Sequence, residues 1–275
     1  MRDRICDLWQ ILRAKGLPAL SGEIRRFVER RIQAVIAWRR RTYAVDLDGI
    51  RARCEIRSYA EALNMIRTYQ TEAPCLRHLV RHLRSTDTFW DVGAYYGLYS
   101  LLAAQICRQV VAFEPYPPNA QRILANAARN LYADRIHVLE LALSDRQDVV
   151  SFDLRGGERA FMMGHVDPGS ASPLRVLAVP GDALVAQGIP PPDVVKIDVE
   201  GHECEVLAGM QQILRTSVRQ LICEVHASAL ARRNRSGCVE RFLEGLGFRV
   251  LLLQSRRTEY FIWADREGSA MNRPG

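Results

Sequence analysis

Three stretches of the sequence carry side chains that could hold a nucleotide-like cofactor and move a proton. The first is the loop Asp91–Gly97, which follows an apolar run and precedes a helical pattern. Its glycines allow a tight turn and a close backbone approach to a ligand. The second stretch is the next apolar run, which ends at Glu114, 17 residues after Gly97. A carboxylate at that point can accept hydrogen bonds from both hydroxyls of a ribose.

The spacing inside the loop distinguishes two kinds of cofactor. A dinucleotide fingerprint reads G-x-G-x-x-G, and its second glycine lets a pyrophosphate approach the backbone. Tyr95 stands at that position here. The D-x-G-x-x-x-G form instead resembles the first motif of class I methyltransferases, which bind S-adenosylmethionine. A nicotinamide-dependent oxidoreductase is the alternative.

The third stretch, Lys196–Glu203, reads K-I-D-V-E-G-H-E. Asp198 ends an apolar run, so we expect its carboxylate at the sheet edge where doubly wound folds bind ligands. Glu224 and His226 end the next run and, being two residues apart, share one side of a strand. The predicted catalytic groups, expected to converge beside the cofactor, are Asp198, His202, Glu224 and His226.

Methyl transfer to a hydroxyl requires a group that accepts the hydroxyl proton. Histidine is the usual base near neutral pH, so His202 or His226 would serve, oriented by Asp198 or Glu224. A divalent metal held by some of Asp198, Glu200, Glu224 and His226 would also lower the pKa of a hydroxyl. Such oxygen ligands suit Mg²⁺ or Mn²⁺, but the metal-free interpretation is favoured.

Together, these stretches resemble the FkbM-type methyltransferases. The resemblance rests on D-V-G-A-x-x-G from Asp91, on the run from Lys196 and on Glu224-Val225-His226, and it covers roughly residues 69–264. It implies methyl transfer from S-adenosylmethionine, usually to a hydroxyl oxygen of a saccharide, glycolipid or natural product. The cofactor-binding residues that it implies are Asp91, Gly93 and Gly97 at the methionine end, Ala94 in the same loop, Glu114 at the ribose, Ser144 and Asp145 near the adenine, and Asp198.

Two further points stay open at this level. Glu72 precedes the first strand, where relatives often carry an acid near the cofactor. It equally suits the first turn of a helix, because Pro74 follows it. A protein of a different class, a cofactor-binding partner subunit without catalysis, is also conceivable, but the intact set Asp91, Glu114 and Asp198 argues against it.

The elements that position these residues alternate between strand and helix from Asp87 onward. Alternation predicts a doubly wound α/β fold with helices on both faces of a parallel sheet, and the resemblance implies seven strands. The strands expected for this sheet are 88–92, 110–113, 136–141, 194–197, 221–225 and 248–253, with 259–264 as an antiparallel closing strand. Two more strands, near 149–153 and 174–179, bracket a glycine-rich segment.

Nearer the N-terminus, Asp48-Gly49 predicts the turn of a hairpin. Helical patterns cover residues 59–69 and 74–83, with a break between them. A further helix is expected over residues 21–41, with Ile24, Phe27, Val28, Ile32, Val35 and Ile36 on one face.

The basic charge of the chain belongs to its N-terminal part. The net charge is +7, and the first 45 residues hold eleven basic and four acidic side chains. We therefore expect a basic helical extension with a small hairpin over residues 1–57 and a catalytic domain over 58–275. The amphipathic helix would pack against the catalytic domain, lie on an anionic membrane or contact an acidic partner.

Three further features of the sequence indicate the compartment of the protein and the kinds of partner that it binds. No apolar stretch is long enough to span a bilayer, and no nucleic-acid-binding motif accompanies the basic charge. The seven cysteines are scattered without a C-x-x-C pair. This pattern predicts buried, unpaired cysteines in a reducing cytoplasm rather than a disulfide framework or a zinc site. A peripheral position at the inner membrane face is the accompanying hypothesis.

Overall fold

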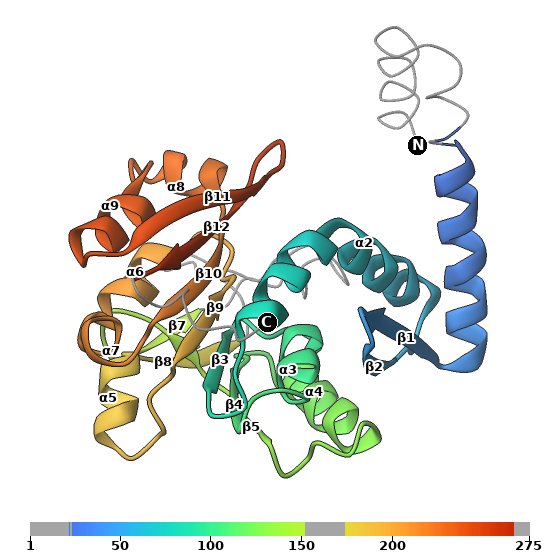
Figure 1. Cartoon of the computed structure of the whole chain (residues 1–275), viewed down its shortest axis with the longest axis horizontal. Helices are drawn as coiled ribbons and strands as arrows, with labels where there is room; N and C mark the ends of the chain where they lie inside the picture. The colour runs from blue at the N-terminus through green and yellow to red at the C-terminus, as the bar shows by residue number, and fades with distance from the viewer. Residues whose placement is uncertain (1–21, 23, 152–173, 267–275) are drawn as a thin grey trace, which may run out of the picture. The chain divides into compact units, whose positions relative to one another are not determined.

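The computed structural model describes residues 22, 24–151 and 174–266 (Figure 1). The contacts between residues of the chain divide it into two units. One contains the described residues up to Val45 together with Arg53–Ala73, and the other contains Asp46–Ala52 and the chain from Pro74 onward. The proposed boundary at residue 57 remains a prediction. The glycine-rich segment and the start of the expected N-terminal helix at Ser21 lie outside the described residues.

The larger unit is built on a seven-stranded sheet, as the sequence predicts. Its order is β11-β12-β10-β9-β3-β4-β5, and β12 alone runs antiparallel to its neighbours. The strands are β3 (Thr88–Val92), β4 (Gln109–Phe113), β5 (Ile136–Leu139), β9 (Val194–Ile197), β10 (Gln220–Val225), β11 (Arg249–Ser255) and β12 (Tyr260–Asp265). The prediction of a mostly parallel sheet with an antiparallel closing strand is therefore confirmed.

Helices cover both faces of this sheet. Figure 1 shows α3 (Leu98–Ala103) and α4 (Pro117–Arg129) on one face. The other face carries α5 (Gly181–Ala186), α6 (Glu203–Ala208), α7 (Gln211–Thr216), α8 (Ala227–Arg232) and α9 (Cys238–Gly245). Every residue of β3, β9 and β10 is buried because these strands lie between two helical layers.

The register of the parallel strands brings distant loops to one edge. Val92 at the end of β3 is paired with Phe113 of β4 on one side and Ile197 of β9 on the other. Ile197 is in turn paired with Cys223, near the end of β10. The segments that follow these strands therefore emerge side by side, which is where doubly wound folds bind ligands.

A separate three-stranded sheet follows β5. It has the order β6-β8-β7 and consists of β6 (Ala142–Leu143), β7 (Asp148–Ser151) and β8 (Arg175–Val179). The apolar run 136–141, expected as one strand, is thus divided between β5 and a turn that leads to β6. The division puts Ser144 directly after β6, against the backbone of α6: a Cβ on Gly209 would lie 1.8 Å from the Ser144 carbonyl oxygen.

Helix α2 (Tyr59–His82) is continuous, so the expectation of two helices broken before Pro74 is wrong. Pro74 lies inside it and cannot donate the backbone hydrogen bond of that position. The division between the two units falls at this residue. Glu72 is therefore not in the first turn of a helix, which rules out that interpretation. Its assignment to the cofactor stays a prediction.

The N-terminal part of the chain contains a hairpin and a basic helix. Strands β1 (Thr42–Leu47) and β2 (Ile50–Glu55) are joined at Asp48-Gly49, as predicted. A helix over residues 24–40 precedes them, drawn in blue without a label in Figure 1. It buries Ala34 and Ala37, whereas its larger apolar side chains are 40–55% exposed, namely Ile24, Val28, Ile32, Val35, Ile36 and Trp38. Phe27 on the same face is partly buried, and packing of this helix against the catalytic domain stays a prediction.

One pair of cysteines contradicts the prediction that the cysteines are unpaired. Cys204 at the start of α6 is joined to Cys238 at the start of α9 by a disulfide. The other described cysteines are unpaired and buried, as expected; they are Cys54, Cys75, Cys107 and Cys223. Cys204 and Cys238 are 34 residues apart, and nothing in their spacing indicates the pairing.

We expect the double variant Cys204→Ser/Cys238→Ser to lose about 3–4 kcal/mol of unfolding free energy, since a loop of this length is no longer closed in the unfolded chain. Urea unfolding with and without dithiothreitol measures the effect. Reductant should lower the stability of the wild type to that of the variant and leave the variant unchanged. A wild type that is insensitive to reductant would contradict the pairing. Thiol alkylation in whole cells would then show whether the compartment keeps the pair oxidised.

Candidate active site

The side chain of Asp91, the first residue of its loop, fixes the loop to helix α3. The Asp91 side chain is fully buried, and its Oδ2 accepts hydrogen bonds from the Ser100 amide (3.0 Å) and hydroxyl (2.6 Å) on α3. Gly93 has a φ of 76°, and a Cβ there would lie 1.8 Å from the Asp198 carbonyl oxygen. Only glycine fits this contact. The loops after β3 and β9 are consequently packed directly on each other.

Glu114 joins this loop to the start of α4. Its Oε2 accepts a hydrogen bond from the Tyr95 amide (2.8 Å), and its Oε1 accepts from the Tyr116 amide (3.0 Å) and the Asn119 side chain (3.4 Å). Burial raises the pKa of Glu114 to about 7, although these hydrogen bonds lower it. A carboxylate offers about four acceptor positions, and three are used. The remaining capacity fits the ribose hydroxyl of a nucleoside.

Lys196 joins the same loop to the third motif. Its Nζ donates to the Gly93 carbonyl oxygen (2.7 Å) and lies 3.4 Å from both Asp91 Oδ1 and Asp198 Oδ2. The buried cation thereby compensates two carboxylates at the centre of the sheet edge. We did not select Lys196 as a site residue, because a lysine within an apolar strand gives no indication of its partners.

Beyond Lys196, acidic side chains surround His226. Its Nδ1 donates to Glu203 Oε1 (2.7 Å), and its Nε2 lies 3.2 Å from Glu200 Oε2 and 3.9 Å from Asp198 Oδ1. The ring is therefore oriented by Glu203, rather than by Asp198 or Glu224 as expected. Asp198 and Glu200 are about a quarter exposed, whereas Glu203 is fully buried. Only the first two carboxylates face a molecule that enters from solvent.

These contacts decide the protonation of the cluster. Burial lowers the pKa of His226, but the hydrogen bond to Glu203 and the charges of Glu200 and Asp198 outweigh it and raise that pKa to about 10. Burial raises the pKa of Glu200 to about 7. At neutral pH His226 is thus a cation, and Glu200 is the group whose pKa suits it to accept a proton.

Three residues of the same cluster could also bind a metal ion. Asp198, Glu224 and His226 each offer one ligand atom, within 4.8 Å of one another. Glu224, however, forms an ion pair with Arg256 (3.0 Å), which occupies one of the three groups. The donor set therefore fits proton transfer better than metal binding.

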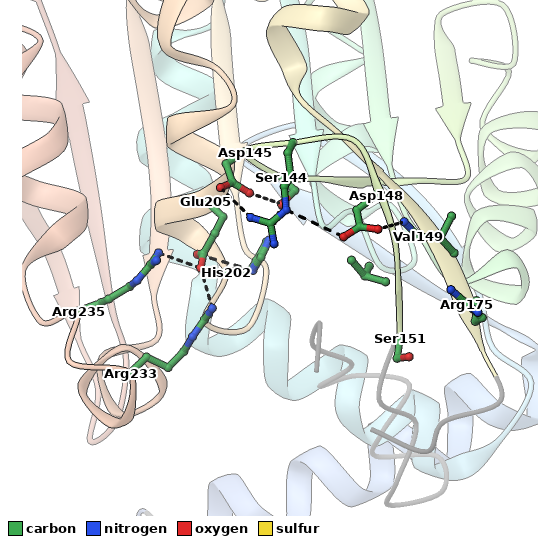
Figure 2. Close-up of a pocket in the computed structure, with 12 residues that line it drawn as sticks. Ser144, Asp145, Asp148, Val149, Ser151, Arg175, His202, Glu205, Arg233 and Arg235 are labelled. Atoms are coloured by element: carbon green, nitrogen blue, oxygen red, sulfur yellow. Dashed lines mark hydrogen bonds and ion pairs between the residues drawn. The ribbon is translucent and has the colours of Figure 1, made fainter. Parts of the chain in front are cut away.

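His202 does not join this cluster, contrary to our expectation. Its Nε2 lies 2.9 Å from the Ser144 hydroxyl and its Nδ1 lies 3.6 Å from Glu205 Oε2, in a separate cavity (Figure 2). Ser144 donates in turn to Asp145 (3.1 Å). Burial lowers the pKa of His202. Ser144 and Asp145, expected near an adenine, line this second cavity together with His202.

The separation of the two histidines follows from one turn. Glu200 and Gly201 both have positive φ values, 54° and 98°, and a non-glycine residue in this region is held there at an energetic cost. The turn directs His202 to one side and Glu203 to the other. Glu200 and Glu203 were not among our catalytic candidates. The Glu-Gly pair before a helix was the one available signal, because it marks a left-handed turn.

A seven-stranded doubly wound sheet with a glycine loop after one strand and an acid after the next defines the class of S-adenosylmethionine-dependent methyltransferases. The comparisons agree with this class. The family model described as the methyltransferase FkbM domain matches residues 91–250. The chain therefore belongs to the FkbM methyltransferase family and is an S-adenosylmethionine-dependent methyltransferase. Neither a nicotinamide-dependent oxidoreductase nor a catalytically silent subunit is favoured.

Two curated relatives are similar over most of the chain. The hexuronic acid methyltransferase AglP of Haloferax volcanii is 32% identical over 183 residues, which is 66% of this chain and 73% of AglP. The 31-O-demethyl-FK506 methyltransferase FkbM of Streptomyces tacrolimicus is 30% identical over 227 residues, which is 70% of this chain and 84% of the relative. A solved methyltransferase FkbM from Methylobacillus flagellatus is 15% identical with a TM-score of 0.49, and the match covers 86% of this chain and 59% of that one.

Proposed function

We propose that this enzyme methylates a hydroxyl oxygen of a saccharide, a glycolipid or a related natural product. The observation that carries the proposal is the acidic cluster around His226, which lies against the cofactor loop through Lys196 and Asp198. The relatives named for a hexuronic acid and for an O-demethyl natural product support this acceptor class.

In the proposed reaction, the bound cofactor supplies a methyl group already activated by its sulfonium. Glu114 would bind the ribose, and the Gly93 backbone would lie against the methionine part. Glu200 accepts the proton of the acceptor hydroxyl, because it combines exposure with a pKa near neutrality. His226, positioned by Glu203, stays protonated beside Glu200 and balances the charges of the carboxylates. Alignment of the hydroxyl for in-line attack contributes most of the remaining acceleration.

The proposal is tested by transfer of labelled methyl groups to a panel of acceptors. We expect turnover with hydroxyl-bearing saccharides and none with their per-O-methylated counterparts. Activity should persist in EDTA, since no step requires a metal. Labelling of the per-O-methylated compounds, or loss of activity in EDTA that Mg²⁺ restores, would contradict the proposed chemistry.

We further propose that the helix over residues 24–40 holds the enzyme on an anionic membrane surface. Within the residues that the structure describes, no helix is long and apolar enough to span a bilayer. The exposed aliphatic side chains of this helix alternate with exposed arginines, including Arg25, Arg26 and Arg31. This combination is typical of helices that lie in the headgroup region.

Sedimentation with vesicles tests this position. We expect the protein to pellet with phosphatidylglycerol vesicles at low salt and far less with phosphatidylcholine vesicles, because the arginines require anionic lipid. Each buried aliphatic side chain contributes about 1.5–3 kcal/mol, so Val28→Ser/Ile32→Ser should lower partitioning by about 10²- to 10⁴-fold. Leu131→Ser is the matched control, since it removes an 87% exposed leucine from the other unit. Equal binding of both variants would refute the role of the helix.

A further inference from the structure

The cavity beside His202 in the larger unit is lined mainly by charged and polar side chains. It has a volume of ≈ 520 Å³, within the range of small-molecule sites. Four arginines reach it from three separate segments: Arg146 from the turn after β6, Arg175 from the start of β8, and Arg233 and Arg235 from the connection between α8 and α9. We refer to it as the arginine cavity.

The arginine cavity is adjacent to the acidic cluster through one short segment. His202 lines the cavity, and the next residue, Glu203, bonds His226 of the cluster. A ligand bound in the cavity would therefore contact the same turn that carries Glu200. This adjacency connects the cavity to the acceptor side of the proposed reaction.

Two of the guanidinium groups are held in place by a buried acid. Glu205 Oε1 accepts from Arg233 (2.6 Å) and lies 2.8 Å from Arg235, and the Glu205 side chain is only 8% exposed. Figure 2 shows both arginines reaching Glu205 from one side of the cavity, with Arg175 on the other side. A guanidinium has five donor hydrogens, so both groups retain donors for a ligand.

Arg175 differs from the other three. It forms no ion pair with any acidic side chain in the described part of the chain, whereas Arg146 approaches Asp145 (3.5 Å) and Asp148 (4.0 Å). The four arginines outnumber the acids of the wall, which are Asp145, Asp148 and Glu205. Among the described lining residues, positive charge therefore exceeds negative charge, which favours an anionic ligand.

The wall also contains polar atoms that have no hydrogen-bond partner among the described residues. Ser144 gives its hydroxyl hydrogen to Asp145, so His202 must donate through Nε2, and its Nδ1 is then an acceptor. That Nδ1 faces Glu205 Oε2, a second acceptor, and both atoms are buried without a hydrogen-bond partner. Unsatisfied polar atoms of this kind are rare in native proteins and commonly mark a place completed by a ligand or water.

We propose that the arginine cavity binds an oxyanion group, a carboxylate or a phosphate, carried by the saccharide acceptor. Guanidinium forks match both groups in a bidentate geometry, and the remaining hydroxyl, histidine and acid groups suit the hydroxyls of a sugar ring. The inference rests on the proposed function for the identity of the acceptor. The binding of the oxyanion itself does not depend on turnover.

Calorimetry on the full chain tests the cavity with three ligands of equal ring size: glucuronate, glucose 6-phosphate and glucose. We expect one or both anionic sugars to bind and glucose to bind at least tenfold more weakly. The stronger of the two anions identifies the group as carboxylate or phosphate. Equal affinity for glucose, or no binding of either anion, would overturn the inference.

Two variants test whether the anionic sugar binds in the arginine cavity. Arg175→Gln and Arg235→Gln should each weaken the anionic sugar at least tenfold, while Arg129→Gln, which removes an exposed charge from α4 outside the cavity, should not. The affinity for S-adenosylmethionine should be unchanged in all three. A joint loss of cofactor affinity would place the cofactor in the cavity and overturn the inference. Methyl transfer to neutral saccharides that survives in Arg175→Gln, without any binding of anions, would overturn it and leave the proposed function intact.

Discussion

Glu200→Gln is expected to lower kcat by about 10²- to 10⁴-fold, the usual contribution of a general base. Glutamine keeps the shape of the side chain but cannot accept the proton of the acceptor hydroxyl. The affinity for S-adenosylmethionine should change little, because Glu200 is not among the predicted cofactor ligands. Glu244→Gln on α9 is the matched control, as it neutralises an exposed glutamate in the same unit.

The pH dependence provides a second measure of the same assignment. Glu200 acts when deprotonated, so kcat should rise with pH up to its pKa of about 7. His226 acts when protonated, so kcat should fall above its pKa of about 10. Glu200→Gln should remove the acidic limb alone, and His226→Gln the basic limb alone. An unchanged acidic limb in Glu200→Gln would assign the base to another group, with Asp198 as the next candidate to substitute.

Glu114→Ala is expected to weaken S-adenosylmethionine binding by at least about 10- to 10²-fold. The hydrogen bond from a ribose hydroxyl to the remaining acceptor position of the carboxylate contributes about 1.5–3 kcal/mol. The variant also leaves the Tyr95 and Tyr116 amides without their acceptor, which loosens the loop that meets the cofactor. Calorimetric titration measures the loss, with NADH as a comparison ligand that should not bind.

Asp134→Ala is the control for this substitution, since Asp134 is an exposed acid in the turn before β5. A thermal unfolding curve separates a folded variant with a damaged site from an unfolded one. Cofactor affinity that survives in a folded Glu114→Ala variant would show that the acid only supports the loop. The ribose would then have to be bound by other groups.

Much of the architecture is readable from the residues themselves. The apolar runs that end at Val92, Phe113, Ile197 and Val225 are short and separated by helical patterns, which specifies parallel strands. Since the carboxyl ends of parallel strands meet at one edge, the order of the motifs already placed the Asp91 loop, Glu114, Asp198 and His226 together. The hairpin turn at Asp48-Gly49 was equally local, because its backbone conformation selects those residues.

Which side chains bond to one another within the site could not be predicted from the sequence in this way. His202 and Glu203 are neighbours in the chain, yet one bonds Ser144 and the other His226, 58 and 23 residues away respectively. Their directions depend on the left-handed turn at Glu200 and Gly201, and periodicity carries no signal for a single residue outside a regular element. The pairing of Cys204 with Cys238 gave no signal either, because the two cysteines lie 34 residues apart on different helices.

The sequence by itself determined the parallel sheet, the loops at its edge and the family, since these follow from local pattern and spacing. Tertiary structure alone decided which side chains meet. It brought Lys196 between Asp91 and Asp198, separated the two histidines and gathered four arginines from three segments. Such contacts join residues that are distant in the chain, and their geometry is fixed by packing and burial rather than by the preferences of any one segment.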